Sequence, residues 1–220
     1  MMEQAPSRGA RGVEQAAVPD IKGVEFYFEF ASPYAYLSSE VIEPLCGGLG
    51  VPLRWKPILL GPIIKRTGAR PLFLDGPRGA YSRADCFRWA ARHGIPFRHW
   101  ARQPVNSLKA ARGALYLRET QHFPAYVHAC FRAHFVAGRD LFDDAVLAAI
   151  VEGLGADVPA FFAAIGEPAL KQRLADETEA AYNRGVFGAP TFFYGDEMIW
   201  GNDRLPLLEE LIREDLAREG

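Results

Sequence analysis

The sequence has few cysteines and no excess of charge of either sign. Its three cysteines, Cys46, Cys86 and Cys130, lie far apart and form no C-x-x-C pair, which argues against a disulfide framework or a cysteine zinc site. The formal net charge is -2, so electrostatics give no reason to expect binding to nucleic acid or to an anionic membrane surface. A reducing compartment fits this cysteine usage best, and we expect a cytoplasmic protein.

Long apolar runs are also missing. No segment approaches the roughly 18 uninterrupted apolar residues that a membrane helix needs, so we expect no membrane span. Residues 1–22 are rich in Ala, Gly, Arg and Gln but lack the apolar core of a signal peptide, which predicts a disordered leader outside the fold. His122, His128 and His134 recur every six residues, a spacing that spreads them around a helix, and we therefore predict no metal site.

The N-terminal part of the fold is predicted to be a β-α-β unit. Residues Val24 to Phe30 alternate apolar side chains with Glu25 and Glu29, the period of a half-buried strand. A helix should run from Pro33 to about Cys46 and end at Gly47-Gly48. Val51 to Pro57 reads as a second strand, and two strands that flank a helix should be parallel.

The rest of the chain predicts a helical block followed by a hairpin and a last helix. The hairpin strands are Thr191 to Tyr194 and Met198 to Trp200, joined by a turn at Gly195-Asp196. This order predicts an α/β fold in which residues 61–182 form an inserted all-helical domain and residues 23–60 and 183–220 form the other domain. The helices are expected at Tyr81 to His93, Ser107 to Glu119, Pro124 to Ala137, Asp143 to Gly153, Val158 to Ile165, Pro168 to Gly185 and Arg204 to Ala217.

The junction between the first strand and the first helix is the strongest candidate for a functional site. Ser32 is a preferred helix N-cap, and Pro33 suits the first helical position. A hydroxyl at a helix N-terminus lies where free N-H groups and the helix dipole stabilise an anion, whether phosphate, carboxylate or thiolate. The simpler alternative is that Ser32 only caps the helix.

Three motifs in order make the chain similar to a known family. They are F-E-F-A-S-P-Y-A-Y-L at residues 28–37, N-R-G-V-F-G-A-P-T-F at residues 183–192 and W-G-N-D-R-L at residues 200–205. The sequence resembles the 2-hydroxychromene-2-carboxylate isomerases and the related kappa-class glutathione transferases. The resemblance implies a thioredoxin-like fold with an inserted helical domain.

The resemblance also implies a role for Ser32. Thiol-disulfide oxidoreductases of the same superfamily carry C-x-x-C where this chain has Ser-Pro-Tyr-Ala at residues 32–35, so no redox dithiol is expected here. A bound glutathione would supply the thiol instead, and the Ser32 hydroxyl would donate to its sulfur and favour the thiolate. Ser32 is therefore the expected catalytic residue.

Two further segments are implied as glutathione contacts. Ala189-Pro190 stands where the superfamily carries a cis-proline, and the N-H and C=O of Ala189 would then face outward to pair with the glutathione backbone. A trans proline opening an edge strand is the alternative. Trp200, Gly201, Asn202 and Asp203 would hold the γ-glutamyl group, although Asp203 also reads as a plain N-cap.

The substrate side follows from the same resemblance. Lys65 lies in a segment that resembles the family's K-x-T-G, where a lysine can hold a carboxylate, but Ala69 stands where the family usually has asparagine. Arg78 and Tyr81, in a Pro- and Gly-rich loop, could reach the same pocket, although a surface arginine and a core tyrosine are the alternatives. Asn106 matches a family position near the substrate and is equally readable as an N-cap.

The implied activity is a glutathione-dependent isomerisation. The enzyme would interconvert a 2-hydroxychromene-2-carboxylate-type acid, a small aromatic 2-hydroxy acid, and the open trans-o-hydroxybenzylidenepyruvate, a 2-oxo acid. The alternatives are a kappa-type transferase that conjugates electrophiles and a non-catalytic thiol-binding protein, and family members are often homodimers. Ala69 and the loop Pro71 to Arg78 predict a substrate other than the simplest naphthalene intermediate.

Overall fold

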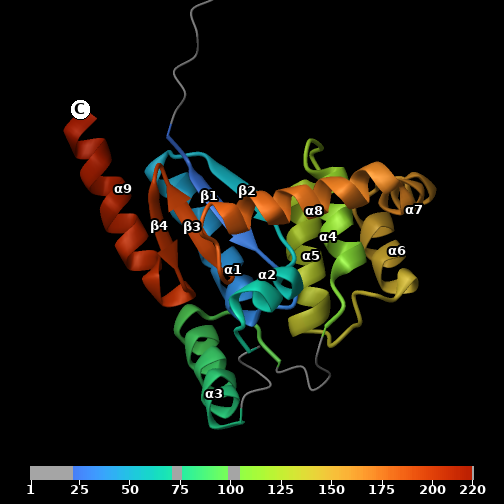
Figure 1. Cartoon of the computed structure of the whole chain (residues 1–220), viewed down its shortest axis with the longest axis horizontal. Coiled ribbons are helices and arrows are strands. Elements are labelled where there is room, and N and C mark those ends of the chain that lie inside the picture. The colour runs from blue at the N-terminus through green and yellow to red at the C-terminus, as the bar shows by residue number, and fades with distance from the viewer. Residues whose placement is uncertain (1–21, 71–75, 99–104, 220) are drawn as a thin grey trace, which may run out of the picture.

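The computed structural model describes residues 22–70, 76–98 and 105–219. Its centre is a four-stranded sheet with the strand order β2-β1-β3-β4, made by β1 (Val24–Phe28), β2 (Leu53–Pro57), β3 (Thr191–Tyr194) and β4 (Glu197–Trp200) (Figure 1). β1 pairs with β2 in parallel and with β3 antiparallel, and β3 pairs with β4 antiparallel. The predicted β-α-β unit and hairpin are confirmed.

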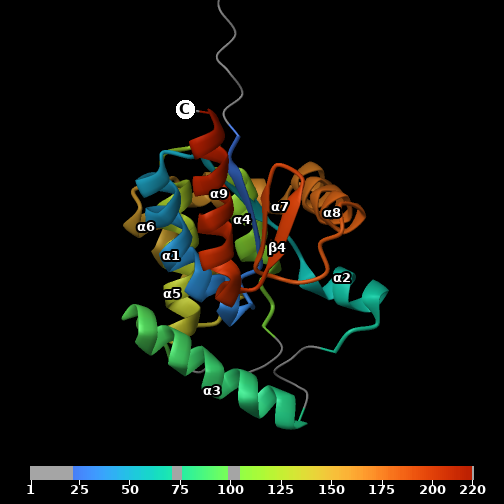
Figure 2. The ribbon, with the colours of Figure 1, turned by 90° about the vertical axis from the view of Figure 1, so that its left-hand side faces the viewer.

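Helices cover both faces of the sheet. α1 (Pro33–Leu49) and α9 (Leu205–Glu219) lie on one face, and α2 (Leu60–Thr67) and α8 (Pro168–Asn183) lie on the other (Figure 2). Successive side chains of a strand point to opposite faces. Phe26 accordingly belongs to the main core, whereas Tyr27 packs in a smaller cluster with residues of α2 and α8.

The segment between β2 and β3 is helical, as expected. Besides α2 and α8 it contains α3 (Gly76–His93), α4 (Leu108–Leu117), α5 (Phe123–Phe135), α6 (Asp144–Gly153) and α7 (Val158–Gly166). The main buried core extends from β1 into this segment, where it includes Phe131 and Phe161. The division into a 23–60 plus 183–220 domain and a 61–182 domain stays a prediction.

Three predicted boundaries are wrong near the start of the fold, and one of them is the start of β2, which is Leu53 and not Val51. β1 ends at Phe28, not Phe30, because the chain turns there and the Ser32 N-H donates to the Glu29 carbonyl at 3.0 Å. α1 continues through Gly47-Gly48 to Leu49 and ends at Gly50, whose φ of 69° is the left-handed conformation that glycine adopts readily. The Gly50 N-H also donates to the Cys46 and Gly47 carbonyls, which closes the last turn of α1.

Other corrections concern the two ends of the helical segment. α2 falls in the region expected to be helical but was not placed as a separate helix. Arg78 and Tyr81 lie within α3, so the loop predicted around them is helix from Gly76 onward. Residues 71–75 of the predicted loop, and all of the predicted leader except Lys22, lie outside the described residues.

Candidate active site

The site is centred on the Ser32 hydroxyl, which lies at the N-terminus of α1. It accepts the Ala35 N-H at 3.2 Å, as an N-cap does, and donates to the Ala189 carbonyl at 2.9 Å. Ser32 therefore caps α1, as the simpler alternative holds. Its hydroxyl also donates a hydrogen bond to a segment far away in sequence, so capping does not exclude a functional role.

That segment carries a cis peptide bond between Ala189 and Pro190, as the resemblance implied. The Ala189 carbonyl accepts from Ser32, and the Pro190 carbonyl accepts the Gly201 N-H at 3.1 Å. The turn after β4 is thus fixed to the cis-proline segment, which is fixed to the start of α1.

A cavity of about 570 Å³ opens beside Ser32, with mostly apolar walls. Of the residues predicted for the site, five line this cavity. They are Ser32, Arg78, Asn106, Ala189 and Trp200. Four parts of the chain that are far apart in sequence therefore meet at one hollow.

The remaining predicted residues do not line the cavity. Lys65 is exposed in the last turn of α2, next to Ile64, which does line it. Tyr81 is 64% exposed, so the alternative of a core tyrosine is wrong, and its ring lies 5.6 Å from the Arg88 guanidinium.

The turn after β4 differs in detail from the prediction. Gly201, with φ of 108°, precedes a short 3-10 helix, Asn202–Arg204, in which Asn202 is buried. Asp203 lies inside this 3-10 helix and pairs with Arg204 at 3.1 Å, so it is not the N-cap of α9, which begins at Leu205. The cavity is lined by Trp200 and Ala189 but not by their chain neighbours Pro190, Gly201, Asn202 and Asp203.

Asn106 and Ser107 divide the capping of α4 in an unusual way. Ser107 occupies the N-cap position, but its side chain makes no capping hydrogen bond. The Asn106 side chain instead accepts the Leu108 N-H at 3.2 Å. The Ser107 hydroxyl donates to the Glu29 carboxyl.

Glu29 is a cavity residue that was not predicted from the sequence. Its strand-like alternation suggested a solvent-facing side chain, yet it lies just past the end of β1, is 4% exposed and lines the cavity. Burial raises the pKa of Glu29, and hydrogen bonds from the Ser107 hydroxyl and the Ala31 N-H lower it, with a result of about 7. The available signal was its position three residues before Ser32.

Tyr34 and Phe187 were also missed as cavity residues. The Tyr34 hydroxyl donates to Asp85 at 3.0 Å, which ties the first turn of α1 to α3. Phe187 packs against Trp200 with ring centroids 4.9 Å apart, and both rings are partly exposed at 42% and 46%. Together they form an aromatic rim on the cavity.

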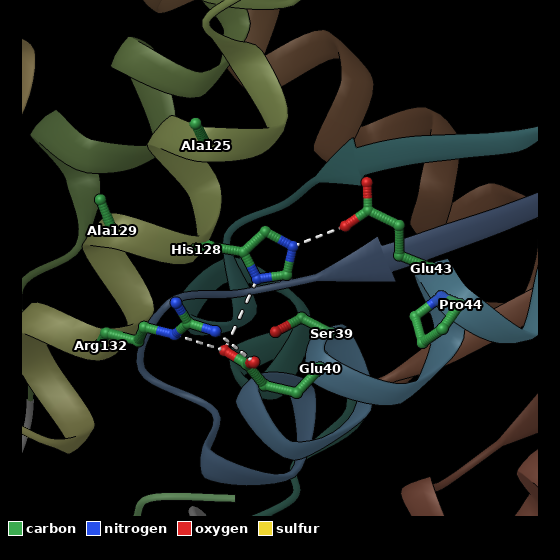
Figure 3. Close-up of a pocket in the computed structure, with 8 residues that line it drawn as sticks. All are labelled: Ser39, Glu40, Glu43, Pro44, Ala125, His128, Ala129 and Arg132. Carbon is green, nitrogen blue, oxygen red and sulfur yellow. Dashed lines mark hydrogen bonds and ion pairs between the residues drawn. The ribbon is translucent and has the colours of Figure 1, made fainter. Parts of the chain in front are cut away.

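A second hollow, of about 590 Å³, lies between α1 and α5 (Figure 3). Glu40 accepts two hydrogen bonds from Arg132, at 2.9 and 2.6 Å, and Glu43 pairs with His128 at 2.7 Å. Burial raises the pKa of Glu40, but hydrogen bonds from His128 and Arg132 outweigh it and lower the pKa to about 2. These groups pair with one another across two helices, so we interpret the cluster as structural.

The described part of the chain lacks two other features, a metal-binding cluster and a membrane-spanning helix. No group of three or more His, Cys, Asp or Glu side chains there is arranged to hold a metal ion. Among the same residues, no helix combines the length and the apolar character needed to cross a membrane.

Known proteins are similar to this chain in sequence and in fold. The sequence matches the family described as DSBA-like thioredoxin domain over residues 23–213. It is 35% identical to a 2-hydroxychromene-2-carboxylate isomerase from Pseudomonas putida over 193 residues, 84% of this chain and 92% of the relative. A solved structure of a 2-hydroxychromene-2-carboxylate isomerase is similar with a TM-score of 0.81 at 35% identity, covering 89% of this chain and 96% of that one. Human glutathione S-transferase kappa 1 is 26% identical over 206 residues, 87% of this chain and 91% of the relative.

Proposed function

Because this chain belongs to the DSBA-like thioredoxin domain family and to the family of 2-hydroxychromene-2-carboxylate isomerases, we propose that it is a glutathione-dependent isomerase. It would interconvert 2-hydroxychromene-2-carboxylate-type acids and the open trans-o-hydroxybenzylidenepyruvate form in the breakdown of aromatic compounds. The observation that carries the proposal is the Ser32 hydroxyl at a helix N-terminus, bonded to the Ala189 carbonyl and open to a largely apolar cavity.

The proposed task of Ser32 is to hold the glutathione sulfur as a thiolate. A free thiol has a pKa of about 8.5, so only a small fraction is ionised at neutral pH. A hydroxyl donor and the N-terminus of α1 both favour the anion. Ser32 would turn its proton from the Ala189 carbonyl to the sulfur, which frees that carbonyl for the glutathione backbone.

The remainder of glutathione is proposed to contact the segments around Ala189-Pro190 and Trp200 to Asp203. The Ala189 N-H and C=O would pair with the peptide as an added strand does. Gly201, Asn202 and Asp203 would take the charged γ-glutamyl end.

The proposed isomerisation is an addition followed by an elimination. The thiolate adds to the benzylic carbon of the conjugated double bond, and the electron pair of that bond moves onto the 2-oxo group as an enolate. The remaining single bond rotates, and the enolate then expels the thiolate and restores the double bond in the trans geometry. The chain supplies positioning and electrostatic stabilisation.

Arg78 and Asn106 are the proposed contacts for the substrate carboxylate and oxygens, because both line the cavity. Lys65 and Tyr81 remain predictions, and alanine substitution at each would test them by KM. Ala69, which also lines the cavity, leaves more room than an asparagine would. We therefore expect larger ring analogues to be turned over faster than the simplest naphthalene intermediate, and equal or slower turnover of them would contradict this.

The first experiment follows the ultraviolet spectrum of 2-hydroxychromene-2-carboxylate with and without glutathione. We expect conversion by the wild type only with glutathione and a loss of about 100-fold or more in Ser32→Ala, the usual effect of removing a donor to a developing anion. Ser39→Ala is the matched control, since Ser39 is also in α1 but donates to the Tyr36 carbonyl away from the cavity.

The same assay separates the alternatives. A stable glutathione conjugate would favour a kappa-type transferase, the reading supported by the 26% identity to the human enzyme. Glutathione binding without conversion or conjugate would favour a non-catalytic thiol-binding protein. Conversion that is equally fast without glutathione would exclude the thiolate mechanism.

We also propose a homodimer in the cytoplasm. The three cysteines are buried and carry no disulfide, which supports a reducing compartment. Sedimentation equilibrium of the full chain would test the dimer, and a mass equal to one chain would contradict it.

A further inference from the structure

Glu29 is a buried carboxyl group on the cavity wall, and the two hydrogen bonds that it accepts in the described part of the chain come from uncharged groups. Its Oε2 accepts the Ala31 N-H at 2.9 Å and its Oε1 accepts the Ser107 hydroxyl. A carboxylate offers about four lone pairs, so two accepted bonds leave capacity for another partner. Because Glu29 lines the cavity, that partner can be a molecule bound there.

The position of Ser107 indicates that the hydrogen bond to Glu29 is favoured over ordinary capping. An N-cap serine usually accepts a backbone N-H of its own helix. Here the Ser107 side chain leaves that role unfilled and donates to Glu29, 78 residues away in sequence. The contact joins the end of β1 to the start of α4 on the cavity wall.

Other groups of the cavity leave this role open. Ser32 is bonded to Ala189, and the Tyr34 hydroxyl donates to Asp85. Burial raises the pKa of Tyr34 well above neutral pH, and Cys86 and Asp85 raise it further. Tyr34 therefore keeps its proton. Arg70 and Arg78 are the other charged side chains that line the same cavity, and a guanidinium group offers donors but no acceptor that could take a proton.

The proposed reaction needs a proton carrier in addition to a thiolate. Before the double bond can rotate, the ring of the 2-hydroxychromene must open. The hydroxyl on the hemiketal carbon must lose a proton, and the ring oxygen must gain one. A group that ionises near pH 7 can take the proton and return it.

We propose that Glu29 carries this proton during ring opening, an inference that rests on the proposed isomerase function. The Glu29 carboxylate takes the proton of the hemiketal hydroxyl, and the oxygen's electron pair forms the 2-oxo group. The bond between that carbon and the ring oxygen breaks, and the ring oxygen leaves as a phenolate. The phenolate then takes the proton back from Glu29, so that atoms and charge balance and no redox partner is needed.

The test uses Glu29→Gln, which keeps the shape of the side chain but cannot carry a proton, and two substrates. The first is 2-hydroxychromene-2-carboxylate, which must open its ring. The second is the cis isomer of benzylidenepyruvate, which lacks the ortho hydroxyl and needs only thiol addition and elimination. We expect Glu29→Gln to lower kcat about 100-fold or more on the first substrate, the usual range for a lost acid-base group.

On the second substrate, Glu29→Gln should stay within about threefold of the wild type, because no step removed by the variant is needed. Glu25→Gln is the control for the substitution itself, since Glu25 lies in β1 outside the cavity and pairs with Arg184. Equal losses on both substrates, or none on either, would overturn the assignment. A wild type that converts neither substrate would instead refute the proposed function.

The pH profile of Ser107→Ala distinguishes an effect on Glu29 from a purely structural role of Ser107, because a structural role would not shift it. The Ser107 hydrogen bond lowers the pKa of Glu29, so its removal should shift the acidic limb of the pH profile of kcat/KM to higher pH. The ionisation assigned to Glu29 should appear in this limb with the ring-opening substrate and vanish in Glu29→Gln. With benzylidenepyruvate the limb should reflect the glutathione thiol alone and should not move in Ser107→Ala. A limb that stays at the same pH in Ser107→Ala would contradict the proposal.

Discussion

The aromatic rim of the cavity depends on a residue without a side chain. Trp200 lies against Gly188, where an added Cβ would come within 2.6 Å of the indole Nε1. The Phe187 ring also packs against this indole. Gly188 therefore sets how closely Trp200 approaches the wall beside Ala189, and this contact shapes the entrance of the site.

Gly188→Ala should displace the Trp200 indole outward. Because the indole is partly exposed and can move, we expect little change in thermal stability but a rise in KM for the aromatic substrate on the order of tenfold. Steady-state kinetics would measure this, with Gly153→Ala as control, since a Cβ there meets no atom within 4 Å. An unchanged KM would mean that Trp200 does not contact the substrate.

At the scale of elements, the ion-pair cluster defined by Glu40, Glu43, His128 and Arg132 fixes α5 to α1, the helix that presents Ser32 (Figure 3). α1 is also held by aromatic packing, with the Tyr36 and Phe135 rings stacked at 5.4 Å. The cluster is partly exposed, so its contribution is modest and depends on pH.

Glu40→Gln should lower the free energy of unfolding at pH 6 by on the order of 1 kcal/mol, a value reduced by the exposure of Arg132. The folded state holds the pKa of Glu40 at about 2, below its ordinary 4.5. The stabilisation is therefore present above pH 4.5 and is lost as the pH falls toward 2. Urea unfolding of both proteins between pH 3 and 6 would measure it.

The difference between wild type and Glu40→Gln should shrink across that range. Glu43→Gln is the matched comparison, because Glu43 is also in α1 but pairs only with His128 in this cluster and is more exposed. A difference that is the same at every pH would indicate lost packing and not lost charge.

For the whole molecule, the sequence predicted the order of elements well because that order follows from local patterns. The strand-Ser-Pro junction, the Gly195-Asp196 turn, where Gly195 has φ of 62°, and the helical block each carry their own signal. Boundaries were less reliable, since either Gly47 or Gly50 could end α1 and only the backbone decides.

The site was predicted in part for the same reason. Ser32 and the 189–190 segment are marked by motifs, whereas the inward position of Glu29 depends on Ser107, which lies in another element far along the chain. Lys65 and Ile64 are neighbours in one helix, and the sequence could not tell which faces the cavity. Tertiary contacts of this kind have no signature in local periodicity.

Glu29 also affects the stability of the molecule as a whole. Its pKa is raised from 4.5 to about 7, so the folded state favours the protonated carboxyl. The stability that protonated Glu29 gives is fully present below pH 4.5 and is lost as the pH rises through 7, a change on the order of 3 kcal/mol. Burial of the ionised Glu29 therefore lowers the free energy of unfolding near pH 7, the pH at which Glu29 is proposed to carry the proton.

The free energy of unfolding of Glu29→Gln, measured relative to the wild type, should consequently be higher at pH 8 than at pH 4. The glutamine stays neutral, so the gain should develop between pH 4.5 and 7 and then level off. Urea unfolding at each pH, monitored by circular dichroism, would measure it. A difference between the two proteins that does not change with pH would mean that Glu29 has the same pKa in the folded and the unfolded chain. A gain that keeps growing well above pH 7 would mean that Glu29 stays protonated in the folded chain, and the carboxylate needed for ring opening would not be available.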